Sequence, residues 1–197
     1  MRSDNRRHRV HRLDHNAVHD SDAMIGLSLE SVKSIAVIGA HCENIAIGAG
    51  ATLLDMTCGR PDIVVNALVL TGGGTEREVE EKNAFSVMCG AADVRLTVAD
   101  LPDGRLPAHW GEVKKHIADF RRRSEPDVVF GPQRHDSHQD HRLIAELIPT
   151  EFRDHLILSY EILKWESELP NPSVYQPVRH ETALHKAALI HECYRSQ

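Results

Sequence analysis

Short apolar runs rich in β-branched residues alternate along the chain with segments whose apolar residues recur at helical spacing. Residues 63–70 are almost continuously apolar, which is typical of a parallel strand that helices cover on both faces. We expect strands over 34–39, 63–70, 93–98, 127–130 and 155–162, and helices over 45–58, 76–88, 109–123, 139–148 and 181–195. This order predicts an α/β fold: a Rossmann-like open sheet, mostly parallel, with helices on both faces.

The two ends of the chain depart from this pattern. Residues 1–30 show no sustained periodicity and are rich in arginine and histidine, so we expect an N-terminal arm that is at most partly ordered. Residues 31–197 are of a size that suits a single domain. Residues 164–177 contain three prolines and no regular pattern, and the chain stops at Gln197 without a capping signal. The C-terminal end of the domain is therefore expected to be short.

Composition narrows the class of protein. The chain of 197 residues is 41% hydrophobic and 26% charged, with a formal charge of −6, which is typical of a soluble globular protein and argues against nucleic acid as a partner. No apolar run approaches the roughly 18 to 20 residues of a membrane span, and residues 1–15 lack the apolar core of a secretory signal. Four cysteines lie far apart, which indicates reduced thiols. These features predict a cytoplasmic protein.

Two clusters of potential metal ligands follow the first and the fourth expected strand. In the common doubly wound strand order 3-2-1-4-5 these strands are neighbours, so clusters almost a hundred residues apart would face each other across one crevice. Catalytic zinc takes three protein ligands of this kind and keeps a fourth position for water. The members are His41, Glu43 and Asn44 in the first cluster, and His138, Asp140 and His141 in the second.

Other features of these loops leave alternatives open. Cys42 could serve as a soft ligand or be a buried, inert thiol. The triple glycine 72–74 could cradle a phosphate, or it could be a loop pressed against the neighbouring site. A dinucleotide-binding enzyme is disfavoured, because the first turn lacks the G-x-G-x-x-G pattern and Gly48-x-Gly50 lies inside the expected helix.

The two clusters resemble the motifs of the PIG-L/LmbE family of zinc-dependent N-deacetylases. That family has a His-Pro-Asp-Asp turn after its first strand, which residues 40–45 match in place and flanks, and a His-x-Asp-His motif after its fourth, which residues 136–141 match closely. The likeness extends to Thr71-Gly72, to Arg77 with Glu80, and to the segments 101–106 and 160–165, and so covers roughly residues 33–197. It implies an LmbE-like fold.

The resemblance also implies roles for single residues. Zn²⁺, or another divalent metal, would be held by His41, Asn44 and His141. Glu43 would be the general base that takes a proton from the zinc-bound water. His138 would steady the oxyanion or protonate the leaving amine.

Further positions are implied around this set. Asp140 would orient a neighbouring histidine, and Asp103 and Arg105 would lie near the substrate. The implied reaction is removal of an acyl group, most simply acetyl, from the nitrogen of an amino sugar or a sugar-bearing metabolite. The expected partner is thus a small N-acyl amino-sugar conjugate, and a homo-oligomer stays open.

Two residues depart from the family pattern at demanding positions. Glu43 and Asn44 stand where the family has two aspartates. Glu43 is longer by one methylene, and Asn44 offers a neutral oxygen that is a poorer zinc ligand than a carboxylate. The alternative hypothesis is therefore a catalytically impaired member that keeps a sugar-binding crevice and acts as a binding or assembly subunit.

Overall fold

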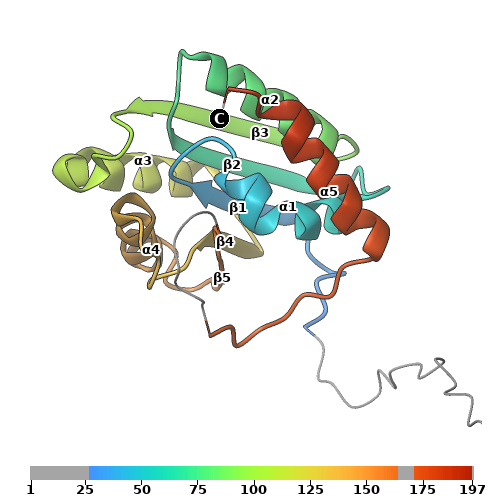
Figure 1. The fold of residues 1–197 in the computed structure, drawn as a ribbon. Helices are drawn as coiled ribbons and strands as arrows, with labels where there is room; N and C mark the ends of the chain where they lie inside the picture. The colour runs from blue at the N-terminus through green and yellow to red at the C-terminus, as the bar shows by residue number, and fades with distance from the viewer. Residues whose placement is uncertain (1–26, 164–170, 197) are drawn as a thin grey trace, which may run out of the picture.

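The computed structural model describes residues 27–163 and 171–196. Within them, five strands form one parallel sheet in the order β3-β2-β1-β4-β5 (Figure 1). The expected arm over 1–30 lies outside the described residues up to position 26. The strands are β1 (Ser34–Gly39), β2 (Val64–Thr71), β3 (Asp93–Leu101), β4 (Val128–Pro132) and β5 (Leu156–Tyr160). The sequence prediction of a mostly parallel α/β sheet is confirmed.

Helices cover both faces of the sheet (Figure 1). One face is covered by α1 (Asn44–Thr57) and α2 (Glu76–Met88), and α5 (His180–Cys193) packs across these two helices. The other face is covered by the short 3₁₀ helix η2 (Leu106–His109), by α3 (Trp110–Arg123) and by α4 (Gln139–Glu151). No helix among the described residues is long and apolar enough to cross a membrane.

The central strand β1 shows why the sheet needs both layers. Its residues alternate between the two hydrophobic cores: Ile35 and Val37 face α1 and α2, whereas Ala36 and Ile38 face α3 and α4. All four are fully buried, so a polar residue at any of them would lack water. This explains the unbroken apolar run, in contrast to the alternating pattern of a strand with one wet face.

β3 and β4 extend beyond their predicted ends by three and two residues, and β2 by one. β3 continues from Val98 to Leu101 because Leu101 still pairs with Thr71 after a local irregularity in β2. β4 continues through Gly131-Pro132, which the sequence suggested as its stop, because these residues pair with Ser159 and Tyr160 of β5. A proline lacks only its own N–H, so it can stand at the end of a ladder.

Parallel β1 and β4 are direct neighbours, so the loops that follow them leave the sheet at the same edge. The ring of Tyr160, whose hydroxyl donates a 2.6 Å hydrogen bond to the carbonyl of Ile38, packs against Gly48 of α1 at this edge. A Cβ on Gly48 would overlap that ring and lie 2.8 Å from the carbonyl oxygen of Glu161.

Gly48→Ala is therefore expected to destabilise the protein by about 1–3 kcal/mol through overpacking, although alanine normally favours a helix by roughly 1 kcal/mol over glycine. The matched control is Gly50→Ala in the same helix, because its Cβ would meet nothing closer than the Met88 sulfur at 3.4 Å. Urea unfolding measures both free energies. Equal effects of the two substitutions would contradict the packing argument.

Candidate metal centre

The turn after β1 holds His41 in place through its own side chains. The Oδ1 atom of Asn44 accepts a 3.0 Å hydrogen bond from the backbone N–H of His41, and the Asn44 amide donates to Oε1 of Glu43 at 3.2 Å. Glu43 itself is left-handed, with φ 77°, and its backbone N–H donates to Oε2 of Glu81 at 2.9 Å. His41, Glu43 and Asn44 are all buried. The turn is therefore a closed network rather than a solvated loop.

The loop after β4 is braced in a similar way. Asp136 accepts a 2.8 Å hydrogen bond from the backbone N–H of His138. Nδ1 of His138 in turn accepts the backbone N–H of Asp140 at 3.2 Å, which makes His138 the N-cap of α4. Because Nδ1 is the acceptor, the neutral His138 ring carries its proton on Nε2.

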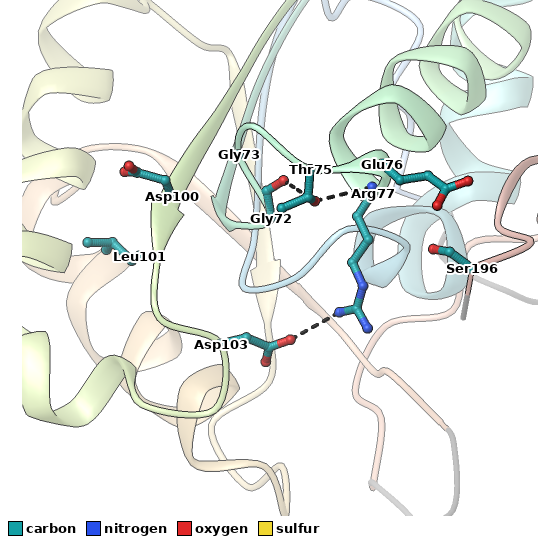
Figure 2. A pocket seen from close by; sticks show the side chains of 9 residues that line it. All are labelled: Gly72, Gly73, Thr75, Glu76, Arg77, Asp100, Leu101, Asp103 and Ser196. Atoms are coloured by element: carbon teal, nitrogen blue, oxygen red, sulfur yellow. Dashed lines mark hydrogen bonds and ion pairs between the residues drawn. The ribbon is translucent and has the colours of Figure 1, made fainter.

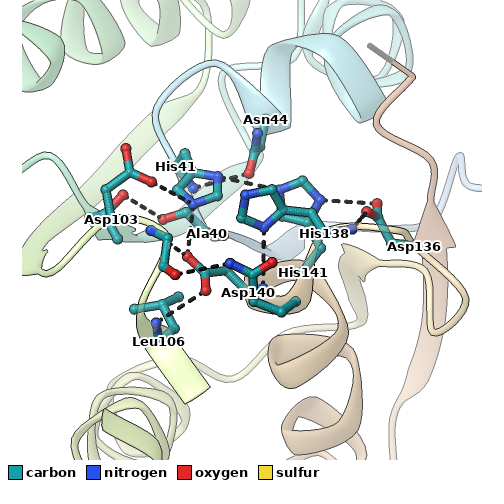
Figure 3. Close-up of polar contacts among 12 residues, drawn as sticks. Ala40, His41, Asn44, Asp103, Leu106, Asp136, His138, Asp140 and His141 are labelled. Atoms are coloured by element: carbon teal, nitrogen blue, oxygen red, sulfur yellow. Dashed lines mark hydrogen bonds and ion pairs between the residues drawn. The ribbon is translucent and has the colours of Figure 1, made fainter. Parts of the chain in front are cut away.

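The two loops meet at a pair of imidazoles (Figure 3). Nδ1 of His41 lies 3.3 Å from Nε2 of His141. The other nitrogen of each ring faces a carboxylate: Nε2 of His41 lies 3.1 Å from Oδ2 of Asp140, and Nδ1 of His141 lies 3.0 Å from Oδ2 of Asp136. A carboxylate at this distance keeps the proton on the nitrogen that faces it. With that tautomer on both rings, the two facing nitrogens carry lone pairs, whereas a proton on Nε2 of His141 would make the 3.3 Å contact a hydrogen bond to His41.

This arrangement fits a divalent metal ion. Two nitrogens bound to one tetrahedral zinc at 2.0–2.1 Å are roughly 3.3–3.4 Å apart, close to the observed separation. Two lone pairs that face each other inside a protein repel unless a proton or a cation lies between them. Metal-binding histidines commonly give their second nitrogen to a carboxylate, as Asp140 and Asp136 provide here.

Two groups of side chains among the described residues could hold a metal ion. The first joins His138 to His41 and His141, with candidate ligand atoms within 4.8 Å of one another. The ring of His138 stacks on His141 at 4.5 Å with an angle of 25° between their planes, so its in-plane nitrogens do not converge on the same point. This geometry, together with the proton on Nε2, favours His138 as a hydrogen-bond donor.

The second group joins His41, Asp103 and Asp140. Both carboxylates approach the same atom, Nε2 of His41, at 3.1 Å. Asp140 also accepts the backbone N–H groups of Gly104 at 2.9 Å and of Leu106 at 3.1 Å. Burial, the largest single cause, would raise the pKa of Asp140, but the hydrogen bond and charge of His41, the charge of His138 and the backbone N–H of Leu106 together hold that pKa below its usual value. Asp140 thus acts as an ionised anchor for His41 and for the 102–106 loop.

A cavity of about 460 Å³ opens beside this centre (Figure 2). Asp103 connects the two: one carboxylate oxygen faces His41, and the other accepts a 3.0 Å ion pair from Arg77. Arg105 is exposed and does not line the cavity. The lining residues are Gly72, Gly73, Thr75, Glu76, Arg77, Asp100, Leu101, Asp103 and Ser196.

Cys42 is held as a buried thiol. Burial, reinforced by the charges of Glu81 and Glu43, raises the pKa of Cys42 to about 12. Its Sγ donates to the carbonyl of Thr71 at 3.7 Å. A thiol with such a pKa stays protonated near neutral pH, so this site favours the inert alternative over a soft metal ligand.

Comparison with known proteins bears on this geometry. The family model described as PIG-L, GlcNAc-PI de-N-acetylase, matches residues 36–150, which include both histidine loops. The chain belongs to the PIG-L family. The resemblance drawn from the sequence motifs is thereby confirmed.

Two curated relatives of this PIG-L chain are named as deacetylases. It is 29% identical over 137 residues to the diacetylchitobiose deacetylase of Thermococcus kodakarensis, an alignment that covers 61% of this chain but only 49% of that protein. The chain thus spans about half the length of that relative. It is 27% identical over 182 residues to the uncharacterized deacetylase YaiS of Escherichia coli, covering 86% of this chain and 95% of YaiS.

Solved structures share the fold of this PIG-L chain. The conserved protein TT1542 from Thermus thermophilus aligns with a TM-score of 0.65 at 24% identity, over 83% of this chain and 79% of that one. The N,N'-diacetylchitobiose deacetylase from Pyrococcus horikoshii aligns with a TM-score of 0.60 at 19% identity, over 81% and 69%. At these identities the likeness supports the fold alone.

Two buried carboxylates of this PIG-L chain were not singled out by sequence reasoning. The sequence did offer a sign that Asp136 belongs to the site, since it lies two residues before His138 in a motif of alternating polar residues. No such sign marked Glu81, because it lies in a highly charged helix, a pattern that predicts a solvated face. In the structure it is fully buried and accepts hydrogen bonds from Glu43 and from the Tyr194 hydroxyl, the latter at 2.7 Å.

Burial raises the pKa of Glu81 to about 7 from an ordinary 4.5; the hydrogen bonds from Glu43 and Tyr194 oppose the shift, and the charge of Glu43 adds to it. Between pH 4.5 and 7 the folded state then binds more protons than the unfolded state, so stability falls as pH rises through this window. Glu81→Gln removes this pH dependence. Its free energy of unfolding, relative to that of the wild type, is therefore expected to rise by roughly 3 kcal/mol from pH 4 to pH 8.

Urea unfolding at both pH values measures this difference between the two proteins. Glu146→Gln, at an exposed site on α4, is the control and is expected to track the wild type. A Glu81→Gln protein whose stability follows the wild type at both pH values would show that Glu81 ionises normally.

Proposed function

We propose that this chain is a metal-dependent hydrolase that removes an N-acetyl group from an amino sugar. The observation that carries the proposal is the pair of facing imidazole nitrogens, Nδ1 of His41 and Nε2 of His141, which lie 3.3 Å apart with a carboxylate beyond each ring. Membership of the PIG-L family and similarity to sugar deacetylases support the same reaction.

The metal would be held by Nδ1 of His41, by Nε2 of His141 and by the carbonyl oxygen of Asn44. The Asn44 oxygen belongs to the same turn and accepts the backbone N–H of His41, which leaves it a second lone pair. A zinc ion in such a site supplies a Lewis acid for the amide carbonyl and lowers the pKa of water toward about 7.

Glu43 and His138 would transfer the protons of the reaction. Glu43 lies buried in the same turn as His41, and its carboxylate would accept the proton of the attacking water. His138 presents Nε2–H and would donate it to the developing oxyanion or to the leaving amine. Burial, together with His41 and His141, lowers the pKa of His138, so its neutral ring is the stable form near pH 7.

The cavity beside the centre favours uncharged or cationic substrates. Its lining carries the acids Glu76, Asp100 and Asp103 against the single cation Arg77, which is already paired with Asp103. Such a lining repels a phosphate or a carboxylate on the substrate. It suits the neutral hydroxyl and acetamido groups of N-acetylated chito-oligosaccharides, the class to which the substrate named for two relatives belongs, and the free amine of the deacetylated product.

A second function has one specific observation in its favour. The Asn44 amide donates to Oε1 of Glu43, and this contact occupies one oxygen of the proposed base with a neutral neighbour. In a binding subunit that lacks hydrolysis, the same contact would keep the turn closed without a metal. Metal content and acetate release separate the two functions.

Wild-type protein is expected to bind about one zinc per chain and to release acetate from N,N'-diacetylchitobiose, and removal of the metal by a chelator is expected to abolish release. His141→Ala is expected to lose the metal. Asn44→Asp adds an anionic ligand and is expected to raise zinc affinity by at least roughly 10-fold, with a higher turnover. Elemental analysis and chelator competition measure both, and an unchanged affinity in Asn44→Asp would exclude residue 44 as a ligand.

Substrate charge provides a separate test. Diacetylchitobiose is expected to be turned over at least about 10-fold more efficiently, in kcat/KM, than N-acetylglucosamine 1-phosphate, because one unfavourable charge contact costs more than 1.4 kcal/mol in such a cavity. Asp100→Asn removes one negative charge from the lining and is expected to reduce the ratio of the two kcat/KM values. A preference for the phosphate in the wild type would contradict the role assigned to the acidic lining.

A further inference from the structure

Glu81 of α2 connects the catalytic turn to the end of α5. Its Oε2 atom accepts two hydrogen bonds, one from the backbone N–H of Glu43 at 2.9 Å and one from the hydroxyl of Tyr194 at 2.7 Å. Tyr194 is itself buried and directly follows α5. Segments around positions 43, 81 and 194 therefore converge on one carboxylate oxygen.

The partner of Glu81 in the turn is a strained peptide. Glu43 is the only non-glycine residue with positive φ in the described parts of the chain, and a left-handed conformation costs such a residue about 1–2 kcal/mol. Its N–H is aimed at Glu81, and no side chain caps the start of α1 in the usual way. A hydrogen bond from this N–H to a carboxylate is among the stronger kinds and offsets that cost.

We propose that Glu81 and Tyr194 are positioning residues that hold Glu43 in its left-handed conformation, so that the Glu43 carboxylate is directed to the reacting water. The inference rests on the proposed function in so far as Glu43 is the base. Tyr194 fixes the Glu81 carboxylate, and Glu81 fixes the peptide.

A purely structural role would favour a different residue at position 81. Glu81 is fully buried, and its Oε1 has no hydrogen-bond partner among the described residues. Burial at such a site penalises the ionised form, which is reflected in its raised pKa. An apolar side chain would fill the space between α1, α2 and α5 at lower cost, so the carboxylate is retained at the expense of stability, as is common at functional sites.

The substitutions that test the proposal separate the acceptor from the charge. Glu81→Gln keeps a carbonyl oxygen that can accept both hydrogen bonds, whereas Glu81→Leu removes the acceptor at similar volume. Tyr194→Phe removes only the hydroxyl. The matched control is Thr57→Val, which breaks a buried hydrogen bond between α1 and the carbonyl of Met88 at the end of α2, far along α1 from the turn.

Amide hydrogen exchange by NMR reports the peptide directly and does not require activity. Exchange of the Glu43 amide is expected to be at least about 10-fold faster in Glu81→Leu, faster by a smaller factor in Tyr194→Phe, and close to wild type in Glu81→Gln and in Thr57→Val. If exchange of the Glu43 amide were equally fast in Thr57→Val, a general loss of stability would explain the effect, and the proposal would be overturned.

Kinetics on diacetylchitobiose provide the second readout. Glu81→Leu is expected to lower kcat by about 10- to 100-fold with KM changed less than about 2-fold, and Glu81→Gln is expected to restore most of kcat. If Glu81→Leu does not fold, Tyr194→Phe decides, with an expected loss in kcat of at least about 3-fold. Wild-type kcat in folded Glu81→Leu, or in Tyr194→Phe if that variant has to decide, would overturn the proposal.

Different results would refute the proposed function and the positioning role of Glu81. A wild-type protein without deacetylase activity, in which the Glu43 amide still depends on Glu81, would refute the proposed function and leave the positioning of the peptide in place. The positioning role alone would be refuted if the wild type is active but neither exchange of the Glu43 amide nor kcat changes when Glu81 is replaced.

Discussion

The centre of this molecule depends on two imidazole nitrogens, on His41 and His141, that face each other at 3.3 Å. Parallel pairing of β1 with β4 brings the two histidine loops to the same edge, and a carboxylate on the far side of each ring keeps the proton there. Such a pair is unfavourable by itself and becomes favourable when a cation lies between the rings. The fold thus brings together side chains that could hold a divalent metal ion.

Buried carboxylates are the means by which this arrangement is maintained. Asp136 and Asp140 each accept a backbone N–H from their own or a neighbouring loop in addition to facing a histidine. Burial by itself would raise the pKa of Asp136, but its hydrogen bonds from His141 and His138 hold that pKa below its usual value. Backbone N–H groups compensate the lost hydration, so the anions stay ionised inside the protein.

Sequence reasoning could reach the fold and the meeting of the two loops, because both follow from local patterns and a common strand order. Continuous apolar runs indicated the parallel strands, and the loops after β1 and β4 carried the histidines. It could not reach Glu81 or Tyr194, because their burial arises only when α5, about a hundred residues later in the chain, packs over α2. Asp103 and Arg105 were both expected near the substrate; Asp103 lines the cavity together with Arg77, whereas Arg105 does not.

Asp140 performs two tasks with one carboxylate: it orients His41, and it pins the 102–106 loop through the N–H groups of Gly104 and Leu106. That loop carries Asp103, a wall of the cavity. Any movement that opens the wall therefore loosens the grip on the imidazole, and any ligand that closes the wall tightens it. If the proposed function holds, thermodynamic reciprocity requires that a sugar that raises the affinity for the metal ion is itself bound more tightly, by the same factor, when the ion is present.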